Sequence, residues 1–193
     1  MADRSPTSRP GGRTARVRAD VHGAVQSLLR DQSVAELTIA QIAERSGVHL
    51  GTLYRRWGSL DGILLDVVTE RLSQSSPMPD TGTLGEDLRE YARQAASDLA
   101  GPEGKLLLRT LVAVRLGAND EAGLPPALSR RFDELGELLD RAAARGENPP
   151  TVQEVFEVVI APLVAGLLFD TQPQGPKAVD HLLDRLDRIT GQG

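Results

Sequence analysis

The chain has 193 residues, enough for one large domain or two small ones, and 40% of them are hydrophobic, which is sufficient for a buried core. It contains no cysteine, which excludes disulfides, thiolate metal sites and a cysteine nucleophile. The net charge is −5, yet residues 1–60 hold nine Arg against five acidic residues, whereas residues 61–193 hold 13 basic and 22 acidic residues. A basic N-terminal part on an acidic body indicates a nucleic-acid reader with a separate second domain.

Residues 1–13 are rich in Pro, Gly, Ser and Arg, a composition typical of disordered segments. We predict a basic arm here, which either contacts DNA, as N-terminal arms do, or is a solvated tail. A first helix is predicted over about 14–31, because apolar residues recur there at helical spacing.

Residues 38–57 form the pattern of two short helices joined by a tight turn. Thr38 and Gln41 have the spacing of a capping box at the start of the first helix. Gly47 suits the left-handed conformation that ends it, and a second helix is predicted from near His49 to Trp57. This is the signature of a helix-turn-helix, whose second helix lies in the DNA major groove. The alternative is an ordinary helical hairpin, which would have no need of the Thr, Tyr and two Arg on the second helix.

The rest of the chain is predicted to be helical, with no alternating strand pattern and no internal repeat. Ser59 is expected to cap a fourth helix, and the Pro- and Gly-rich stretch 73–85 is the best domain boundary. We therefore predict a DNA-binding domain over 14–75 and a second domain over 76–193. Five further helices are expected over about 84–100, 103–116, 127–145, 152–169 and 177–190.

The longest apolar run covers residues 158–169 and contains Pro162, where a helix kink is expected. Its 12 residues are fewer than the roughly 20 that a membrane span needs. No secretory signal is visible either. We predict a buried helix in a soluble, cytoplasmic protein with no membrane partner.

The stretch from Leu37 to Trp57, with Ser59, resembles the DNA-binding signature of the TetR (tetracycline-repressor-like) family of bacterial transcription regulators. The matching residues are Leu37, Thr38, Ile42, Ala43, Gly47, Val48, Gly51, Thr52, Leu53, Tyr54, Trp57 and Ser59. The resemblance implies an all-α fold of about nine helices, in which a three-helix helix-turn-helix unit precedes a helical domain for ligand binding and dimerisation. It further implies a homodimer on a partly palindromic operator DNA, more often a repressor than an activator, which a small-molecule effector releases.

Two positions depart from the family pattern. His49 stands where Ser usually caps the recognition helix, so this cap is either missing or supplied by the imidazole. Leu60 stands where Lys is common, so fewer phosphate contacts are expected at that point.

The predicted DNA-contacting residues are Thr38, His49, Leu50, Gly51, Thr52, Tyr54, Arg55 and Arg56. Thr38 and Tyr54 are suited to phosphate contacts. Arg55 and Arg56 either grip guanine bidentately or hold phosphates, and the sequence leaves both readings open.

Two further sets of candidates lie in the second domain. The expected pocket residues are Tyr91, Arg109, Arg115, Phe132 and Phe156, although each arginine has an ordinary alternative as a surface ion pair. The expected dimer residues are Ile160, Leu163, Val164, Leu167, Leu182, Leu183, Leu186 and Ile189, although a monomeric core needs such apolar stripes equally.

Enzyme motifs are missing from the sequence: there is no Gly-rich phosphate loop, no G-x-S-x-G and no H-E-x-x-H. The three histidines are far apart and have no ligand partners at metal spacing. We predict no catalytic site, no metal and no cofactor. The alternatives to a repressor are an activator of the same fold and a helical interaction module without specific DNA binding.

Overall fold

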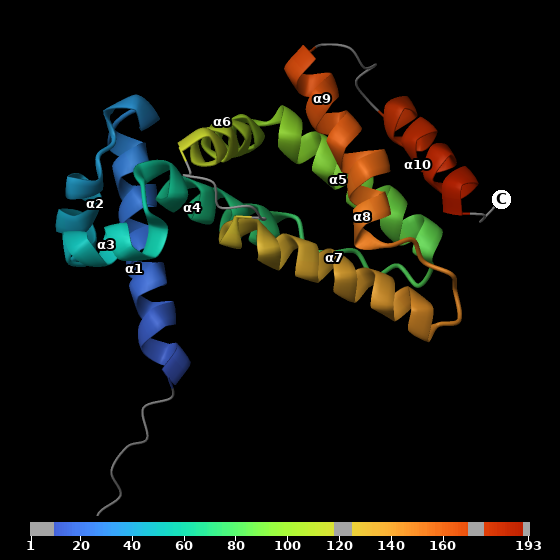
Figure 1. The fold of residues 1–193 in the computed structure, drawn as a ribbon, viewed down its shortest axis with the longest axis horizontal. Helices are drawn as coiled ribbons and strands as arrows, with labels where there is room; N and C mark the ends of the chain where they lie inside the picture. Colours follow the sequence, from blue (N-terminus) through green and yellow to red (C-terminus); the bar gives the residue numbers. More distant parts are fainter. Residues whose placement is uncertain (1–9, 118–124, 170–175, 191–193) are drawn as a thin grey trace, which may run out of the picture. The chain divides into compact units, whose positions relative to one another are not determined.

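The computed structural model describes residues 10–117, 125–169 and 176–190 (Figure 1). Within these ranges the chain forms nine helical segments, one short 3-10 turn and no strand, which confirms the predicted all-α class. The chain divides into two compact units between Val67 and Val68. This division lies within α4 (Leu60–Ser75), ahead of the boundary expected after residue 75.

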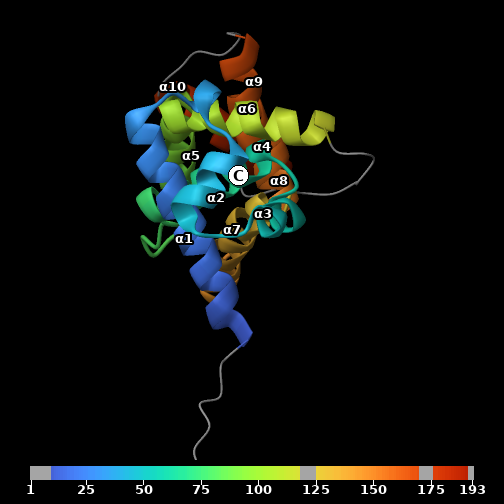
Figure 2. The ribbon, with the colours of Figure 1, turned by 90° about the vertical axis from the view of Figure 1, so that its left-hand side faces the viewer.

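The first unit packs α1 (Pro10–Asp31), α2 (Ile39–Ser46), α3 (Leu50–Trp57) and the first part of α4 around one apolar core. Figures 1 and 2 show α2 and α3 beside α1. The side chains with no exposed surface in this core are Val21, Val25, Ile42, Leu53 and Ile63.

α1 begins at Pro10, earlier than the predicted residue 14. Proline suits a first helical position, because its missing N–H would have no partner there and its φ is already helical. Residues 10–13 of the predicted arm are therefore helical, and residues 1–9 lie outside the described part of the chain.

The predicted helix ends of the first unit are present in atomic detail. Thr38 Oγ1 accepts from the Gln41 N–H at 3.3 Å and Gln41 Oε1 accepts from the Thr38 N–H at 2.8 Å, a reciprocal capping box. Gly47 ends α2 with φ of 67°, where a side chain would be strained. Ser59 Oγ accepts from the Gly62 N–H at 3.0 Å and so caps α4.

The second unit contains the C-terminal part of α4 and the remaining helices. These are α5 (Leu84–Ala100), α6 (Pro102–Gly117), α7 (Pro126–Ala144), α8 (Val152–Val155), α9 (Ala161–Phe169) and α10 (Pro176–Thr190). α5 is central, because it contacts α6, α7, α9 and α10. Its Leu88 and Tyr91 pack with Leu138 and Val155 in a second apolar core.

A π-helical segment, Phe156–Ile160, joins α8 to α9, so that residues 152–169 form one continuous helical run. The Ala161 N–H donates to the Phe156 carbonyl, five residues back. Pro162 follows directly, and a proline inside a helix donates no hydrogen bond and crowds the preceding turn. The sequence predicted a kink at Pro162, and the structure has a wider, π-helical turn directly before this residue.

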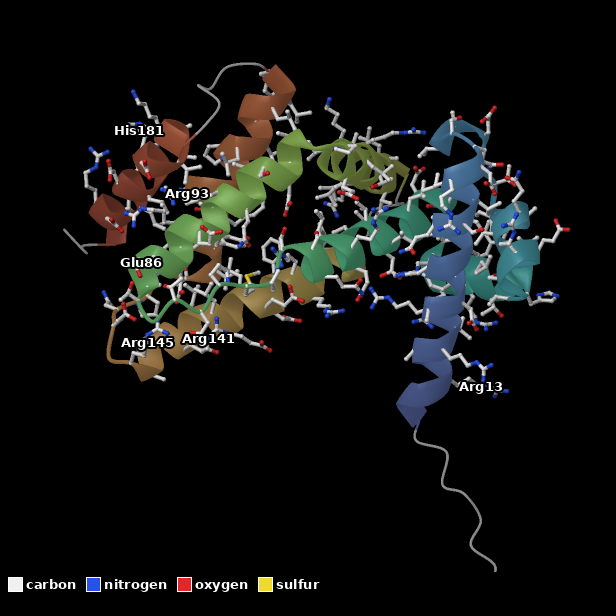
Figure 3. All side chains as sticks on the ribbon, turned by 180° about the vertical axis from the view of Figure 1, so that it is seen from behind. Arg13, Glu86, Arg93, Arg141, Arg145 and His181 are labelled. Atoms are coloured by element: carbon white, nitrogen blue, oxygen red, sulfur yellow. The ribbon has the colours of Figure 1, made fainter. Side chains whose placement is uncertain are left out.

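A buried carboxylate ties the start of α5 to the end of α7. Asp87 has no exposed surface, and it accepts hydrogen bonds from the Thr81 N–H at 2.6 Å and from Arg145 Nη2 at 3.1 Å. Burial raises the pKa of Asp87, but the hydrogen bonds from Thr81 and Arg145 outweigh burial and leave that pKa below its usual value. Figure 3 shows Arg141 and Arg145 together at the end of α7, close to the start of α5.

By length and composition alone, the run Val152–Phe169 would be apolar enough to span a membrane, with a mean hydropathy of 1.9. Only 17% of its residues are buried within the protomer. The prediction of a buried helix therefore holds for only part of this run, and most of its apolar surface is incompletely covered by the chain itself.

Candidate nucleic-acid interface and effector cavity

α3 has one buried face and one exposed face. Leu53 has no exposed surface and Trp57 packs against the same core, as expected for the anchors of this helix. Leu50 and Tyr54, which are 40% and 51% exposed, share the opposite face with exposed Gly51. Such a face, bearing a phenol, an isobutyl group and open backbone, is suited to enter a DNA groove.

His49 caps α3 through its side chain. Its Nδ1 accepts from the Gly51 N–H at 3.2 Å, so the imidazole takes the role that a serine hydroxyl usually has. This hydrogen bond keeps the ring at the exposed start of the helix, beside Leu50.

The two arginines of α3 have different surroundings. Arg56 Nη1 donates to the Thr14 carbonyl of α1 at 3.0 Å, and the Arg56 guanidinium carbon lies 4.9 Å from the Trp57 ring centroid. Among the residues that the structure describes, Arg55 has only a long contact, of 3.5 Å to Thr52 Oγ1 on its own helix. Arg55 is therefore the better candidate for reading bases, and Arg56 is held against α1.

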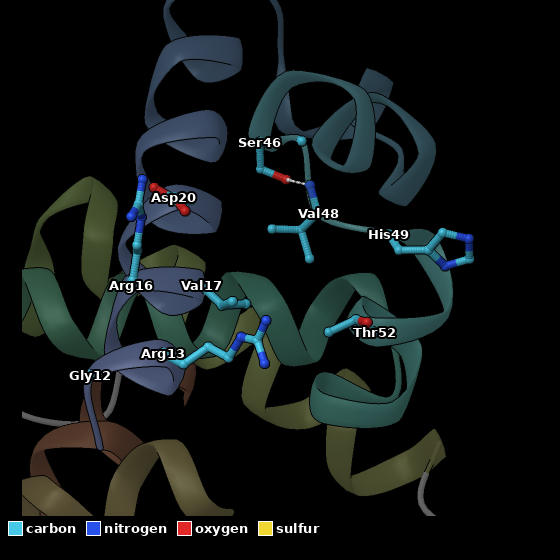
Figure 4. Close-up of a pocket in the computed structure, with 10 residues that line it drawn as sticks. Gly12, Arg13, Arg16, Val17, Asp20, Ser46, Val48, His49 and Thr52 are labelled. Carbon is cyan, nitrogen blue, oxygen red and sulfur yellow. Dashed lines mark hydrogen bonds between the residues drawn. The ribbon is translucent and has the colours of Figure 1, made fainter. Parts of the chain in front are cut away.

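A groove in the first unit runs between the start of α1 and the turn before α3 (Figure 4). Arg13 and Arg16 of α1 line it together with His49 and Thr52. Asp20 is the only acidic residue among those lining it. Two arginines beside the recognition helix create a local positive potential, which suits a phosphate. The sequence predicted a helix from about residue 14, which includes Arg16, but it placed Arg13 in the arm and did not indicate that both residues lie beside α3.

Below α3, a buried carboxylate connects α1, α3 and α4. Asp66 of α4 accepts hydrogen bonds from Arg18 Nη2 at 2.7 Å and from Trp57 Nε1 at 2.9 Å. Its carboxylate also contacts His22 Nε2 at 3.0 Å. Burial raises the pKa of Asp66, but the hydrogen bonds from His22, Arg18 and Trp57 together hold it far below its usual value. Sequence reasoning missed this cluster, because the partners of Asp66 are nine to 48 positions away from it.

The second unit encloses an apolar cavity of about 150 Å³. Three of the five candidate pocket residues, Tyr91, Phe132 and Phe156, line it, and the two Phe ring centroids are 5.5 Å apart. The other two predicted pocket residues, Arg109 and Arg115, are exposed and do not line it. Both lie on α6, whose Leu108 and Leu111 face the cavity instead.

Sequence reasoning missed two charged residues at the cavity, Asp98 of α5 and Arg131 of α7. Arg131 Nη1 donates to Glu134 Oε2 at 3.1 Å, and its guanidinium carbon lies 5.8 Å from the Tyr91 ring centroid. Asp98 lies seven residues after Tyr91, and residues at this spacing share one face of a helix. This spacing is the signal in the sequence that could have identified Asp98 as a neighbour of Tyr91.

The residues predicted at a dimer surface have several locations. Leu182, Leu183 and Leu186 are buried in the protomer, which argues against contact with a partner, because α10 turns this stripe toward α5. Ile160 and Val164 line the cavity, and Leu163 packs on the core. Leu167 is half-buried, and Ile189 is 59% exposed. The exposed Leu168 and Phe169 were not predicted.

Two family models match the chain. The model described as "Bacterial regulatory proteins, tetR family" matches residues 24–67, and the model described as "Tetracyclin repressor-like, C-terminal domain" matches residues 78–186. The first match lies within the first structural unit and the second within the second unit.

Known proteins resemble the chain over much of its length. The HTH-type transcriptional regulator AqdR of Rhodococcus erythropolis is 28% identical over 135 residues, which are 70% of this chain and 65% of AqdR. The uncharacterized regulator YdeS of Bacillus subtilis is 28% identical over 64% of this chain and 63% of its own length. The aligned region thus spans just under two thirds of these two relatives.

Among solved structures, the TetR family transcription regulator SCO0332 has a TM-score of 0.71 and 26% identity, covering 91% of this chain and 97% of its own. A TetR transcriptional regulator from Rhodococcus sp. RHA1, at 16% identity, has the same fold, with a TM-score of 0.61 and coverage of 92% and 97%.

Proposed function

The chain belongs to the TetR family of bacterial regulatory proteins, and we propose that it is a ligand-responsive repressor that binds a partly palindromic operator as a homodimer. It is a DNA-binding transcriptional regulator, in a family whose members are not enzymes. A DNA-binding regulator of this kind acts in the cytoplasm.

The observation that carries the DNA-binding proposal is the exposed face of α3 beside the basic groove. Leu50 and Tyr54 project from this face, and within the described part of the chain the exposed Arg55 makes only the 3.5 Å contact to Thr52. Arg13 and Arg16 line the adjacent groove, where phosphates would be attracted. Base reading at α3 and phosphate contacts at α1 together make a specific protein–DNA interface.

The observation that supports a homodimer is the uncovered apolar surface of the run Val152–Phe169. Leu168 and Phe169 of this run are 55% and 71% exposed, and Ile189 of α10 is 59% exposed. An apolar helical run that the protomer leaves largely uncovered, as 152–169 is, marks an interaction site. In a homodimer, two recognition helices would enter successive major grooves about 34–36 Å apart.

The cavity supports ligand control. A ligand in the second unit would act by favouring one spacing of the two DNA-binding units, which changes the populations of DNA-bound and free protein. A repressor that an effector releases loses DNA binding when the ligand is added. An activator of the same fold would instead keep or gain DNA binding in the presence of the ligand.

The test is binding of the full chain to the duplex upstream of its own gene, compared with a shuffled duplex of equal composition. At near-physiological salt we expect specific binding with two protomers per duplex. Weak binding to both duplexes, falling equally with salt, would be non-specific and would contradict an operator at that position. A reporter gene placed behind the bound duplex separates repression from activation.

Two matched variants test the assignment of the arginines. We expect Arg55→Ala to reduce discrimination at particular base pairs by about 1–3 kcal/mol, because the variant cannot make a bidentate contact to guanine. Arg56→Ala should leave discrimination unchanged, since Arg56 is held by the Thr14 carbonyl and the Trp57 ring. Equal weakening on every sequence for both variants would make both arginines phosphate contacts.

A further inference from the structure

The cavity of the second unit has walls that are almost wholly apolar. α6 contributes Leu107, Leu108 and Leu111, whose spacing of one, three and four residues places them on one helical face. The run from α8 to α9 contributes Phe156, Ile160 and Val164. Among the described residues that line the cavity, those with a polar side chain are Thr69, Tyr91, Asp98 and Arg131.

The positive charge of Arg131 is already neutralised. Glu134, which accepts from Arg131, also accepts from Arg130 Nε at 3.0 Å, and Arg130 Nη1 donates to Glu70 at 2.7 Å. Two arginines and two glutamates therefore balance one another at this wall. An anionic ligand would have to compete with Glu134 for the guanidinium, which disfavours it.

Asp98 is different, because its carboxylate has no hydrogen-bond or ion-pair partner among the residues that the structure describes. It is half-buried in the last turn of α5, a turn without a basic residue. The C-terminus of α5 and the N-terminus of α6 meet here, and their partial charges have opposite signs and offset each other. The helix ends therefore do not compensate the negative charge of Asp98. A half-buried carboxylate beside apolar walls is stabilised by a cation that replaces the missing water.

We propose that the cavity binds a small apolar ligand with one positive charge, an aromatic or alkyl amine, whose ammonium group donates to Asp98. This inference rests on the proposed function, since it names the chemical class of the effector at the same site. The apolar body of the ligand lies among Phe132, Phe156 and the leucines of α6. Tyr91, whose hydroxyl also has no partner among the described residues, offers a second polar contact two helical turns from Asp98.

The size of the cavity limits the ligand. An apolar cavity of about 150 Å³ is large enough to hold a benzene ring. We therefore choose three probes that share one ring and differ in charge: benzylamine, benzyl alcohol and benzoate.

The experiment measures binding of each probe to the full chain by isothermal titration at neutral pH, separately from any effect on DNA. We expect benzylamine to bind about 10- to 100-fold more tightly than the other two, the factor that a charge-assisted hydrogen bond supplies. Asp98→Asn should remove this preference while the melting temperature stays unchanged, because the Asp98 carboxylate has no partner among the described residues. Asp140→Asn, a change of the same kind at an exposed site on α7, should keep the preference.

Tighter binding of benzoate or benzyl alcohol, or an unchanged preference in Asp98→Asn, would overturn the inference, as would failure of all three to bind. A preference for benzoate that Arg131→Gln abolishes would instead assign an anionic ligand. These outcomes are separate from a failure of the proposed function, which would appear as the absence of specific operator binding or its indifference to every bound ligand.

Discussion

Asp66 is the residue whose replacement should most affect the DNA-binding unit. In Asp66→Asn the side chain keeps its shape but not its charge, and its amide group faces the donors of Arg18 and Trp57. Removing one partner of a buried ion pair costs about 3–5 kcal/mol. The Arg18 side chain is 28% exposed, so water replaces part of its hydrogen bonding, and we expect the free energy of unfolding to fall by about 3 kcal/mol, near the lower limit of that range.

The chain contains its own probe for this measurement. Trp57 is the single tryptophan, and its Nε1 donates to Asp66 at 2.9 Å, so its fluorescence reports the unfolding of the first unit. Urea titration of the wild type and Asp66→Asn should show a lower midpoint for the variant with the same dependence on urea. Glu44→Gln, an exposed change of the same kind, should remain within about 0.5 kcal/mol of the wild type.

The effect should depend on pH in one direction. Because the pKa of Asp66 lies below its ordinary value of 3.8 when the chain is folded, its stabilising contribution is fully present above that value and is lost as the pH falls toward the folded pKa. The difference between wild type and Asp66→Asn should therefore shrink in acid below about pH 4. A difference that is small at neutral pH, or that grows in acid, would refute the argument.

Three further predictions concern the groove, helix packing and the dimer. Arg13→Ala with Arg16→Ala should weaken DNA binding alike on all sequences and reduce the salt slope by about 0.9 for each phosphate that is no longer neutralised, measured by anisotropy at several salt concentrations. Gly104→Ala should lower the melting temperature, because its Cβ would collide with the backbone of Leu99, whereas Gly136→Ala on α7, whose Cβ would meet Val152 Cγ2 at an ordinary 3.8 Å, should raise it slightly. Phe169→Glu should shift sedimentation toward the monomer without changing helicity, and an unchanged dimer would locate the interface elsewhere.

Local patterns predicted most of the fold. Each of the nine helices in the described part of the chain appears close to its expected range, because apolar spacing, capping residues and prolines act within a few positions of one another. Thr38, Gly47 and Ser59 have the predicted roles at helix ends. For His49, the sequence could not decide between a missing and a substituted cap, and the structure has the imidazole in that role.

Local patterns could not predict the partners of long side chains, or which neighbour the apolar face of each helix packs against. Arg55 and Arg56 are adjacent in the sequence, yet only Arg56 reaches α1, 42 positions away. Likewise, Leu182 and Leu186 look the same in sequence whether α10 turns them toward its own core or toward a partner. These outcomes depend on tertiary packing, which propensity and periodicity do not contain.

The π-helical turn of Phe156–Ile160 is equivalent to one extra residue in an otherwise regular helix. Each residue advances an α-helix by about 100°, so deleting one residue here would restore regular hydrogen bonding and rotate everything that follows by about that angle. Val164 would leave the cavity wall, and Leu168 and Phe169 would point in a new direction relative to α8. The register of this single turn therefore sets both which side chains line the cavity and which remain on the surface.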